Sequence, residues 1–223
     1  MLLERPMFKK YFPALLCTLA LIMPGSLLVA HPHNWINVST NFVLDEQNRL
    51  VMIKQSWEFD GIYSMITAAN LKNAYENEQV GLTLMAEQMK KNLAGYDYFS
   101  NLLIDGEKVK IPRAGHAHLT MESRPPISVM TLDLDLKFDK PVELVGKELT
   151  WSVFDPTYYI AMNHKEVDDI TISNSSGVEC GKELVIPQVT EETIAYANSL
   201  DKSQRDTDGL GNQFAERVIV KCI

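Results

Sequence analysis

Four of the five histidines form two His-x-His pairs, His31 with His33 and His116 with His118. In an extended backbone, side chains two residues apart point to the same face, so both members of a pair can reach one ion. Pro32 favours this extended geometry at His31. Imidazole nitrogens suit zinc, copper and nickel and are poor ligands for calcium or magnesium. The two pairs therefore predict a transition-metal site.

Each histidine pair also has an ordinary structural interpretation. His116 and His118 alternate with apolar residues, which is typical of the solvent-facing side of a strand. His31 and His33 would form a solvated terminus if they bound nothing. His164 has no partner at ligand spacing, so it is left out of the predicted site.

Two aspartates are candidates to join the histidines, Asp60 first and Asp155 second. Either carboxylate could coordinate the metal, or accept a hydrogen bond from the second nitrogen of a ligating imidazole. Asp60 precedes Gly61 and Asp155 precedes Pro156, and aspartate at such positions favours turns. A turn-capping role is therefore the alternative for both.

Residues 1–30 have the pattern of a secretory signal peptide. A basic start is followed by the apolar run Tyr11–Met23, and the segment ends in the small residue Ala30. The run is shorter than the roughly 20 apolar residues that span a bilayer, although an uncleaved anchor is the alternative. We expect cleavage after Ala30 and a periplasmic protein whose single mature domain covers residues 31–223.

Cleavage after Ala30 would leave His31 with a free α-amine. The amine and ring nitrogens of one residue can chelate a metal together, and His33 would supply a third nitrogen. Three or four nitrogen ligands, with or without one carboxylate, would make a tetrahedral zinc site.

The charge of the chain excludes nucleic acid as a partner. The formal net charge is −8, and removal of residues 1–30 takes away three basic residues and one acidic one, giving −10. Nucleic-acid phosphates require clustered lysine and arginine, which so acidic a chain does not offer. After residue 30 no apolar run is long enough to cross a membrane.

Only Cys180 and Cys222 follow the predicted cleavage site. Two cysteines in an exported chain predict one disulfide, because that compartment is oxidising. The bridge would close the segment from 180 to 222 and restrain the C-terminus. The alternative is that both are thiolate metal ligands.

The elements that must position these residues are mainly strands. Period-two alternation predicts a hairpin over 34–44 and 50–59, and helical spacing predicts a helical block over about 62–94. Together they predict an α+β, mainly β fold, a β-sandwich-like domain with a helical insertion. The other elements expected are strands over 98–104, 108–111, 130–138, 149–153, 167–172 and 214–222, a helix over 191–199, and a loop over 201–212.

Five motifs occur in one order along the mature chain. They are His31-Pro32-His33, Trp57-Glu58-Phe59-Asp60, Tyr96-Asp97-Tyr98-Phe99, Asp155-Pro156-Thr157-Tyr158-Tyr159, and Phe214-Ala215-Glu216-Arg217-Val218 with Cys222. The series resembles a family of bacterial periplasmic proteins of unknown function that includes the ZevA-type zinc-uptake proteins.

The resemblance implies a protein that handles zinc and works with an inner-membrane permease of the nickel/cobalt type. Its His-Pro-His start carries over onto His31 and His33. The Tyr158 and Tyr159 rings have an ordinary explanation as core or near-surface aromatics. We expect no enzyme, since no catalytic constellation or phosphate loop stands out. The alternatives are a copper-binding protein or oxidative enzyme that uses the N-terminal histidine, and a structural interaction module.

Overall fold

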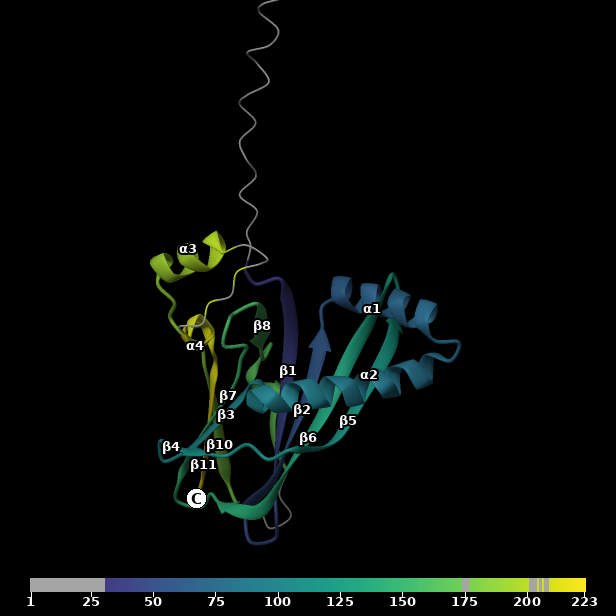
Figure 1. Ribbon diagram of the computed structural model, residues 1–223. Helices are drawn as coiled ribbons and strands as arrows, with labels where there is room; N and C mark the ends of the chain where they lie inside the picture. The colour runs from purple at the N-terminus through teal and green to yellow at the C-terminus, as the bar shows by residue number, and fades with distance from the viewer. Residues whose placement is uncertain (1–30, 174–176, 201–203, 205, 207–208) are drawn as a thin grey trace, which may run out of the picture.

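The computed structural model describes most of the chain that follows the predicted signal peptide (Figure 1). The signal-peptide prediction itself, residues 1–30, lies outside the described residues, as does much of the loop expected over 201–212. The described residues are 31–173, 177–200, 204, 206 and 209–223.

The larger sheet has six strands in the order β5-β6-β2-β1-β8, with β9 also paired to β1. Most neighbours are antiparallel, but β8 and β9 lie parallel to β1, β8 along its first half and β9 along its second. The strands are β1 (Asn34–Leu44), β2 (Arg49–Phe59), β5 (Ala114–Arg124), β6 (Ile127–Glu143), β8 (Ile160–Asn163) and β9 (Ile170–Ser173).

The smaller sheet has five antiparallel strands in the order β10-β11-β7-β3-β4. The predicted disulfide joins its edge strand β10 to β11, since Cys180 lies opposite Cys222 and the two sulfurs are bonded. The strands are β3 (Ser100–Ile104), β4 (Glu107–Val109), β7 (Glu148–Val153), β10 (Cys180–Val185) and β11 (Arg217–Cys222).

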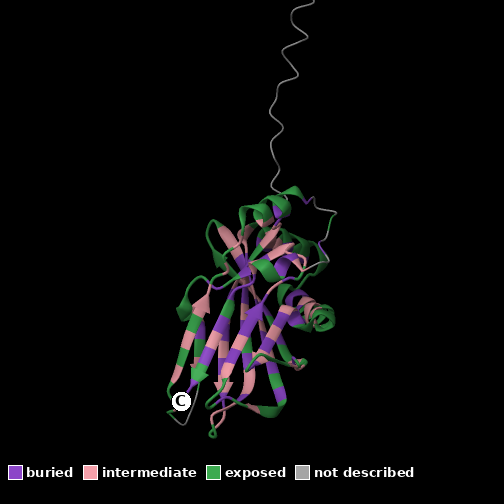
Figure 2. Cartoon of the chain, turned by 90° about the vertical axis from the view of Figure 1, so that its left-hand side faces the viewer, coloured by how far each residue is buried: buried purple, intermediate pink, exposed green. Residues whose placement is uncertain are grey.

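The two sheets enclose one apolar core. Alternate residues of β1, β2 and β6 are buried, and the intervening residues face outward, as the striped strands of Figure 2 show. From the smaller sheet, Leu102 and Trp151 join the same core. The larger sheet therefore has an apolar inner face and a polar outer face, and the mainly β, α+β fold is confirmed.

The helical insertion is a pair of helices that packs on β5 and β6. Helix α1 (Gly61–Ala74) begins at the N-cap Asp60, and α2 (Glu78–Leu93) begins at the N-cap Asn77. Leu71 of α1 and Leu82 and Ala86 of α2 belong to the core cluster, so the helices extend the core over the end of the sheet that the smaller sheet does not cover (Figure 1). The remaining helices are η1 (Ala94–Phe99), η2 (Val167–Asp169), α3 (Glu191–Ser199) and α4 (Leu210–Phe214).

Several predicted boundaries require correction. The strand expected from residue 98 begins at Ser100, because Tyr98 and Phe99 have φ values of 54° and 53° within η1. The strand expected over 167–172 begins at Ile170, after the turn η2. The strand expected from Phe214 begins later, because that residue ends α4, an element the sequence did not predict.

Candidate functional site

His31 and His33 lie together at the start of β1. Their ring centroids are 4.9 Å apart with the rings at 64° to each other. His31 is only 1% exposed, and among the described residues neither of its ring nitrogens has a hydrogen-bond partner. The extended-strand argument does not apply to His31, because β1 begins only at Asn34. The contact between the pair is nevertheless the one that the spacing predicted.

Tyr159 completes an aromatic cluster around this histidine pair. Its ring centroid lies 5.7 Å from that of His31, edge-on at 84°, and 4.6 Å from that of His33. The backbone N–H of His33 also donates to the carbonyl of Tyr159 at 2.9 Å. Sequence reasoning treated Tyr159 as an ordinary aromatic, and the only signal for it was its place in the Asp-Pro-Thr-Tyr-Tyr motif.

Asp155 organises the turn that carries Tyr159. Its carboxylate accepts hydrogen bonds from the N–H and hydroxyl of Thr157, both at 2.9 Å, and from the N–H of Ile160 at 3.1 Å. Asp155 is buried, so these bonds replace those that water would make. The structure thus gives Asp155 the turn-capping role that the sequence offered as an alternative.

Asp60 has the equivalent role at the junction of β2 and α1. Its Oδ1 accepts the N–H groups of Ile62 and Tyr63, both at 2.9 Å, which caps the helix. Its Oδ2 accepts the N–H of Trp35 at 3.4 Å. Asp60 therefore lies beside the backbone of β1 at Trp35, a residue whose side chain is 54% exposed.

His116 and His118 lie on the polar outer face of the larger sheet. On β5 they pair directly with Asp135 and Asp133 of β6, and their rings stack at 6.0 Å. This is the solvent-facing strand position that the sequence offered as an alternative to a metal site. The surface there is hollowed by about 560 Å³. Its lining includes His116, His118, Asp133, Asp135, Lys54, Asn41, Asp168 and Asp169.

The two histidine pairs occupy different parts of the sheet. The row that contains His116 runs through Asp135 and Lys54 to Asn41 on β1. Asn41 is seven residues beyond the start of β1, roughly 23 Å at about 3.3 Å per residue. The pairs are therefore too far apart to share one ion. Within the described ranges, no three His, Cys, Asp or Glu side chains are grouped so that they could hold a metal.

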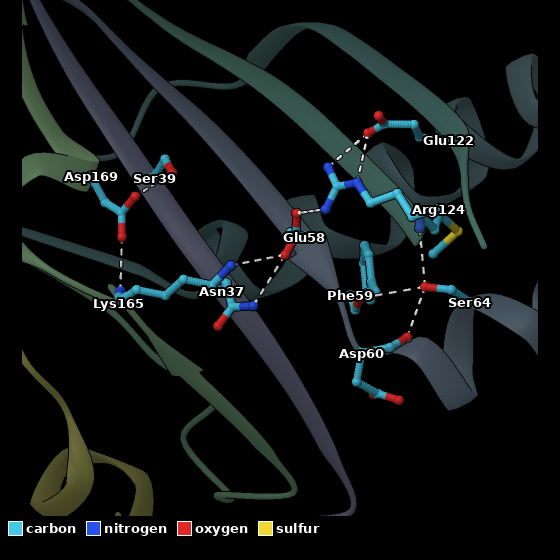
Figure 3. A network of polar contacts seen from close by, with 11 residues as sticks. Asn37, Ser39, Glu58, Phe59, Asp60, Ser64, Glu122, Arg124, Lys165 and Asp169 are labelled. Atoms are coloured by element: carbon cyan, nitrogen blue, oxygen red, sulfur yellow. Dashed lines mark hydrogen bonds and ion pairs between the residues drawn. The ribbon is translucent and has the colours of Figure 1, made fainter. Parts of the chain in front are cut away.

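A network of ion pairs and hydrogen bonds surrounds Glu58 on β2 (Figure 3). Glu58 accepts hydrogen bonds from Arg124 at 2.7 Å, Lys165 at 3.0 Å and Asn37 at 3.3 Å. Burial acts to raise the pKa of Glu58, but the hydrogen bonds from Arg124 and Lys165 outweigh it and hold the pKa below its ordinary value. The network ties β5, β2, β1 and the loop before η2 together.

His164, which was left out of the predicted site, is buried, and both of its ring nitrogens have polar partners. Its Nε2 contacts the Thr40 hydroxyl at 3.1 Å, and its Nδ1 contacts a Glu216 carboxylate oxygen at 3.2 Å. The same oxygen accepts the backbone N–H of His164 at 2.8 Å. Because Glu216 directly precedes β11 and Thr40 lies on β1, this histidine links the two sheets and is not available as a ligand.

Comparison with known proteins places the chain in a family. Residues 15–222 match the family described as "Protein of unknown function (DUF1007)", and the chain belongs to that family. It is 31% identical over 203 residues to an uncharacterized protein of Haemophilus influenzae, covering 87% of this chain and 92% of that relative. No solved structure matches the chain.

Among the residues that the structure describes, no helix is both long enough and apolar enough to cross a membrane.

Proposed function

We propose that this protein binds a transition metal in the periplasm, with zinc as the cargo, and delivers it to an inner-membrane permease. The observation that carries the proposal is the burial of the His31 ring without hydrogen-bond partners in the part of the chain that the structure describes. Both of its ring nitrogens are buried and lack a hydrogen-bond partner among the described residues, and the His33 ring lies against it.

A buried imidazole without a partner costs free energy, because its nitrogens lose hydrogen bonds to water and gain nothing in return. A metal ion bound to a ring nitrogen would offset that cost. Zinc, copper and nickel are the ions that imidazole prefers. This argument separates His31 from His116 and His118, whose exposed rings can bond to water.

The third ligand in this proposal is the α-amine of His31. Two imidazoles alone do not make a structural zinc site, which takes four ligands. Cleavage after Ala30 would create the amine on the residue whose ring is already buried beside His33. The precursor, with that nitrogen in a peptide bond, has no grouping of three suitable side chains in its described part. A fourth position would remain for transfer of the ion to an acceptor.

The permease partner comes from the family resemblance. The five ordered motifs resemble those of the ZevA-type zinc-uptake proteins, which implies an acceptor of the nickel/cobalt-permease type. The disulfide between Cys180 and Cys222 agrees with an exported protein, since such bonds persist in oxidising compartments.

Copper is the second candidate, and Tyr159 is the observation that favours it. An oxidative copper site built on an N-terminal histidine would want an aromatic neighbour, and the Tyr159 ring lies against both imidazoles. Redox activity of the copper-loaded protein would place this oxidative function ahead of zinc transport.

The test is zinc and copper affinity by chelator competition, with protein processed so that His31 is the first residue. We expect one zinc ion per chain, lost in the double variant His31→Ala, His33→Ala. The matched control, His116→Ala with His118→Ala, removes two histidines from the outer face and should retain zinc. Affinity should fall between about pH 7.5 and about pH 5, because protons compete with metal for imidazole.

Three results would count against the proposal. If the processed protein binds neither metal, it is better described as an interaction module. If both double variants bind zinc as the unmodified protein does, the histidines are not the ligands. Zinc affinity that is equal at both pH values also excludes an imidazole site.

A further inference from the structure

The loop from Asp155 to Tyr159 contacts the C-terminal segment, by which we mean helix α4 (Leu210–Phe214). The N–H of Gly211 donates to the carbonyl of Pro156 at 3.0 Å. A Cβ added at Gly211 would collide with the carbonyl oxygen of Asp155, so only glycine permits this approach. Helix α4 therefore packs directly on the turn that leads to Tyr159.

A ring stack forms the second contact between the loop and α4. The ring centroids of Tyr158 and Phe214 are 3.7 Å apart, and the ring planes are nearly parallel, at 12°. Burial raises the pKa of Tyr158 above its ordinary value. Tyr158 has a φ of 55°, a left-handed conformation that non-glycine residues adopt only where surrounding contacts maintain it. The stack supplies such a contact.

We propose that Tyr159 is the positioning residue of the N-terminal metal site and that the Phe214 stack and the Gly211 approach hold it in place. This inference rests on the proposed function. The Tyr159 ring packs against both imidazoles, so it limits how they rotate. The C-terminal segment thereby sets metal affinity although it contributes no ligand.

The backbone supports the same arrangement. The His33 N–H donates to the Tyr159 carbonyl, and β8, which begins at the next residue, pairs with the start of β1. A displacement of the loop would therefore move both the ring and the main chain that face His33. In characterised sites, removal of a group that hydrogen-bonds to a ligating histidine changes metal affinity by roughly 10–100-fold, and we expect the lower end of that range for a ring contact.

The experiment compares Tyr159→Phe, Tyr159→Leu and Phe214→Leu in the processed protein, with zinc as the probe. Zinc affinity is measured by chelator competition, and the imidazole proton resonances are recorded by NMR in the metal-free protein. We expect Tyr159→Leu to weaken zinc binding roughly tenfold and to shift the His31 and His33 resonances. Tyr159→Phe should retain both properties, because the ring contact remains.

Phe214→Leu should produce the same changes as Tyr159→Leu to a smaller degree. Its thermal unfolding serves as the control, since a change in zinc affinity must occur at temperatures where the variant is fully folded. If Phe214→Leu leaves both the affinity and the imidazole resonances unchanged, the C-terminal segment does not hold the site.

The remaining outcomes are also decisive. If Tyr159→Phe weakens zinc binding as much as Tyr159→Leu, the hydroxyl acts as a ligand and the positioning role is wrong. Unchanged affinity and resonances in Tyr159→Leu would overturn the inference altogether. If the unmodified protein binds no zinc, the proposed function fails. The metal-free resonances of the variants then still decide whether Tyr159 positions the histidines.

Discussion

Asp60 directly follows β2, caps α1 and accepts the N–H of Trp35, so its carboxylate joins the start of α1 to β1. Replacement by alanine should lower the free energy of unfolding by about 1 kcal/mol, the ordinary effect of losing a helix cap. Asparagine retains an acceptor oxygen and should retain most of the stability. Urea unfolding of Asp60→Ala and Asp60→Asn measures the difference.

Zinc titration of the same two variants separates capping from metal coordination. If Asp60 coordinates the ion, Asp60→Asn will lose zinc affinity while it remains stable. Equal destabilisation by alanine and asparagine would instead show that the charge, and not the cap geometry, stabilises the start of α1.

At the scale of single residues, the sequence predicted contacts within a motif and missed those between motifs. His31 and His33 were expected to lie together and they do, although β1, whose extended geometry was the basis of that expectation, begins only at Asn34. Tyr159 could not be assigned in this way, because it meets His33 through the parallel pairing of β8 with β1, and that pairing depends on the path of the chain between them. The turn roles of Asp60 and Asp155 were foreseen as alternatives, since local sequence favours them.

Glu58, on the outer face of β2, should make the stability of the protein depend on pH. Glu58 has a lowered pKa in the folded protein, so its ionised form stabilises the fold above the ordinary value of 4.5. That contribution is lost as the pH falls through the lower, folded-state pKa. Glu58→Gln should therefore be less stable near neutral pH by about 0.5–1 kcal/mol, discounted for the exposed partners Arg124 and Lys165.

The measurement is the unfolding free energy of Glu58→Gln and of the unmodified protein across the acid range. The two curves should converge in acid, where Glu58 is protonated. A difference that stays constant down to the lowest pH would indicate that the ion network does not depend on the charge of Glu58.

Two predicted elements match their bounds to the residue, whereas the longest strand, β6, was expected over 130–138 and runs from Ile127 to Glu143. β1 alternates over its whole length and α3 begins at a threonine N-cap, so both match their expected bounds. Three strands were not among the expected elements: β8 and β10, which have four and six residues, and β5, which has eleven. The start of β3 was misplaced because Tyr98 has a residue type that favours strands, while tertiary contacts hold it in a left-handed turn.

The disulfide between β10 and β11 gives an element-scale prediction. The bond joins residues 42 apart, and the chain-entropy account assigns such a loop about 3–4 kcal/mol. Cys180→Ala with Cys222→Ala should lower the unfolding free energy by about this amount. Urea unfolding measures it, and reduction of the unmodified protein is the control. An unchanged free energy in both would mean that strand pairing alone secures the C-terminus.

At the scale of the whole molecule, the start of β1 and helix α4 lie at the same end of the two sheets, and the C-terminus lies at the other end (Figure 1). The loop from Asp155 to Tyr159 lies between β1 and α4, in contact with His33 on one side and with Gly211 on the other. The disulfide lies where β11 ends, so β11 connects it to the segment that supports Tyr159. Three motifs that are distant in the sequence thus form one site, which no local pattern could have predicted.

The three tryptophans are distributed unevenly between this end of the molecule and its interior. Trp57 and Trp151 are at most 1% exposed, whereas Trp35 is 54% exposed and follows His33 by two residues. Excitation at the red edge should therefore select the solvated indole of Trp35, whose emission lies at longer wavelength than that of the buried pair. Copper at the terminal site should quench that component alone, and zinc should leave its intensity intact. The chain thus contains its own optical reporter, two residues from the site at which the ion is expected.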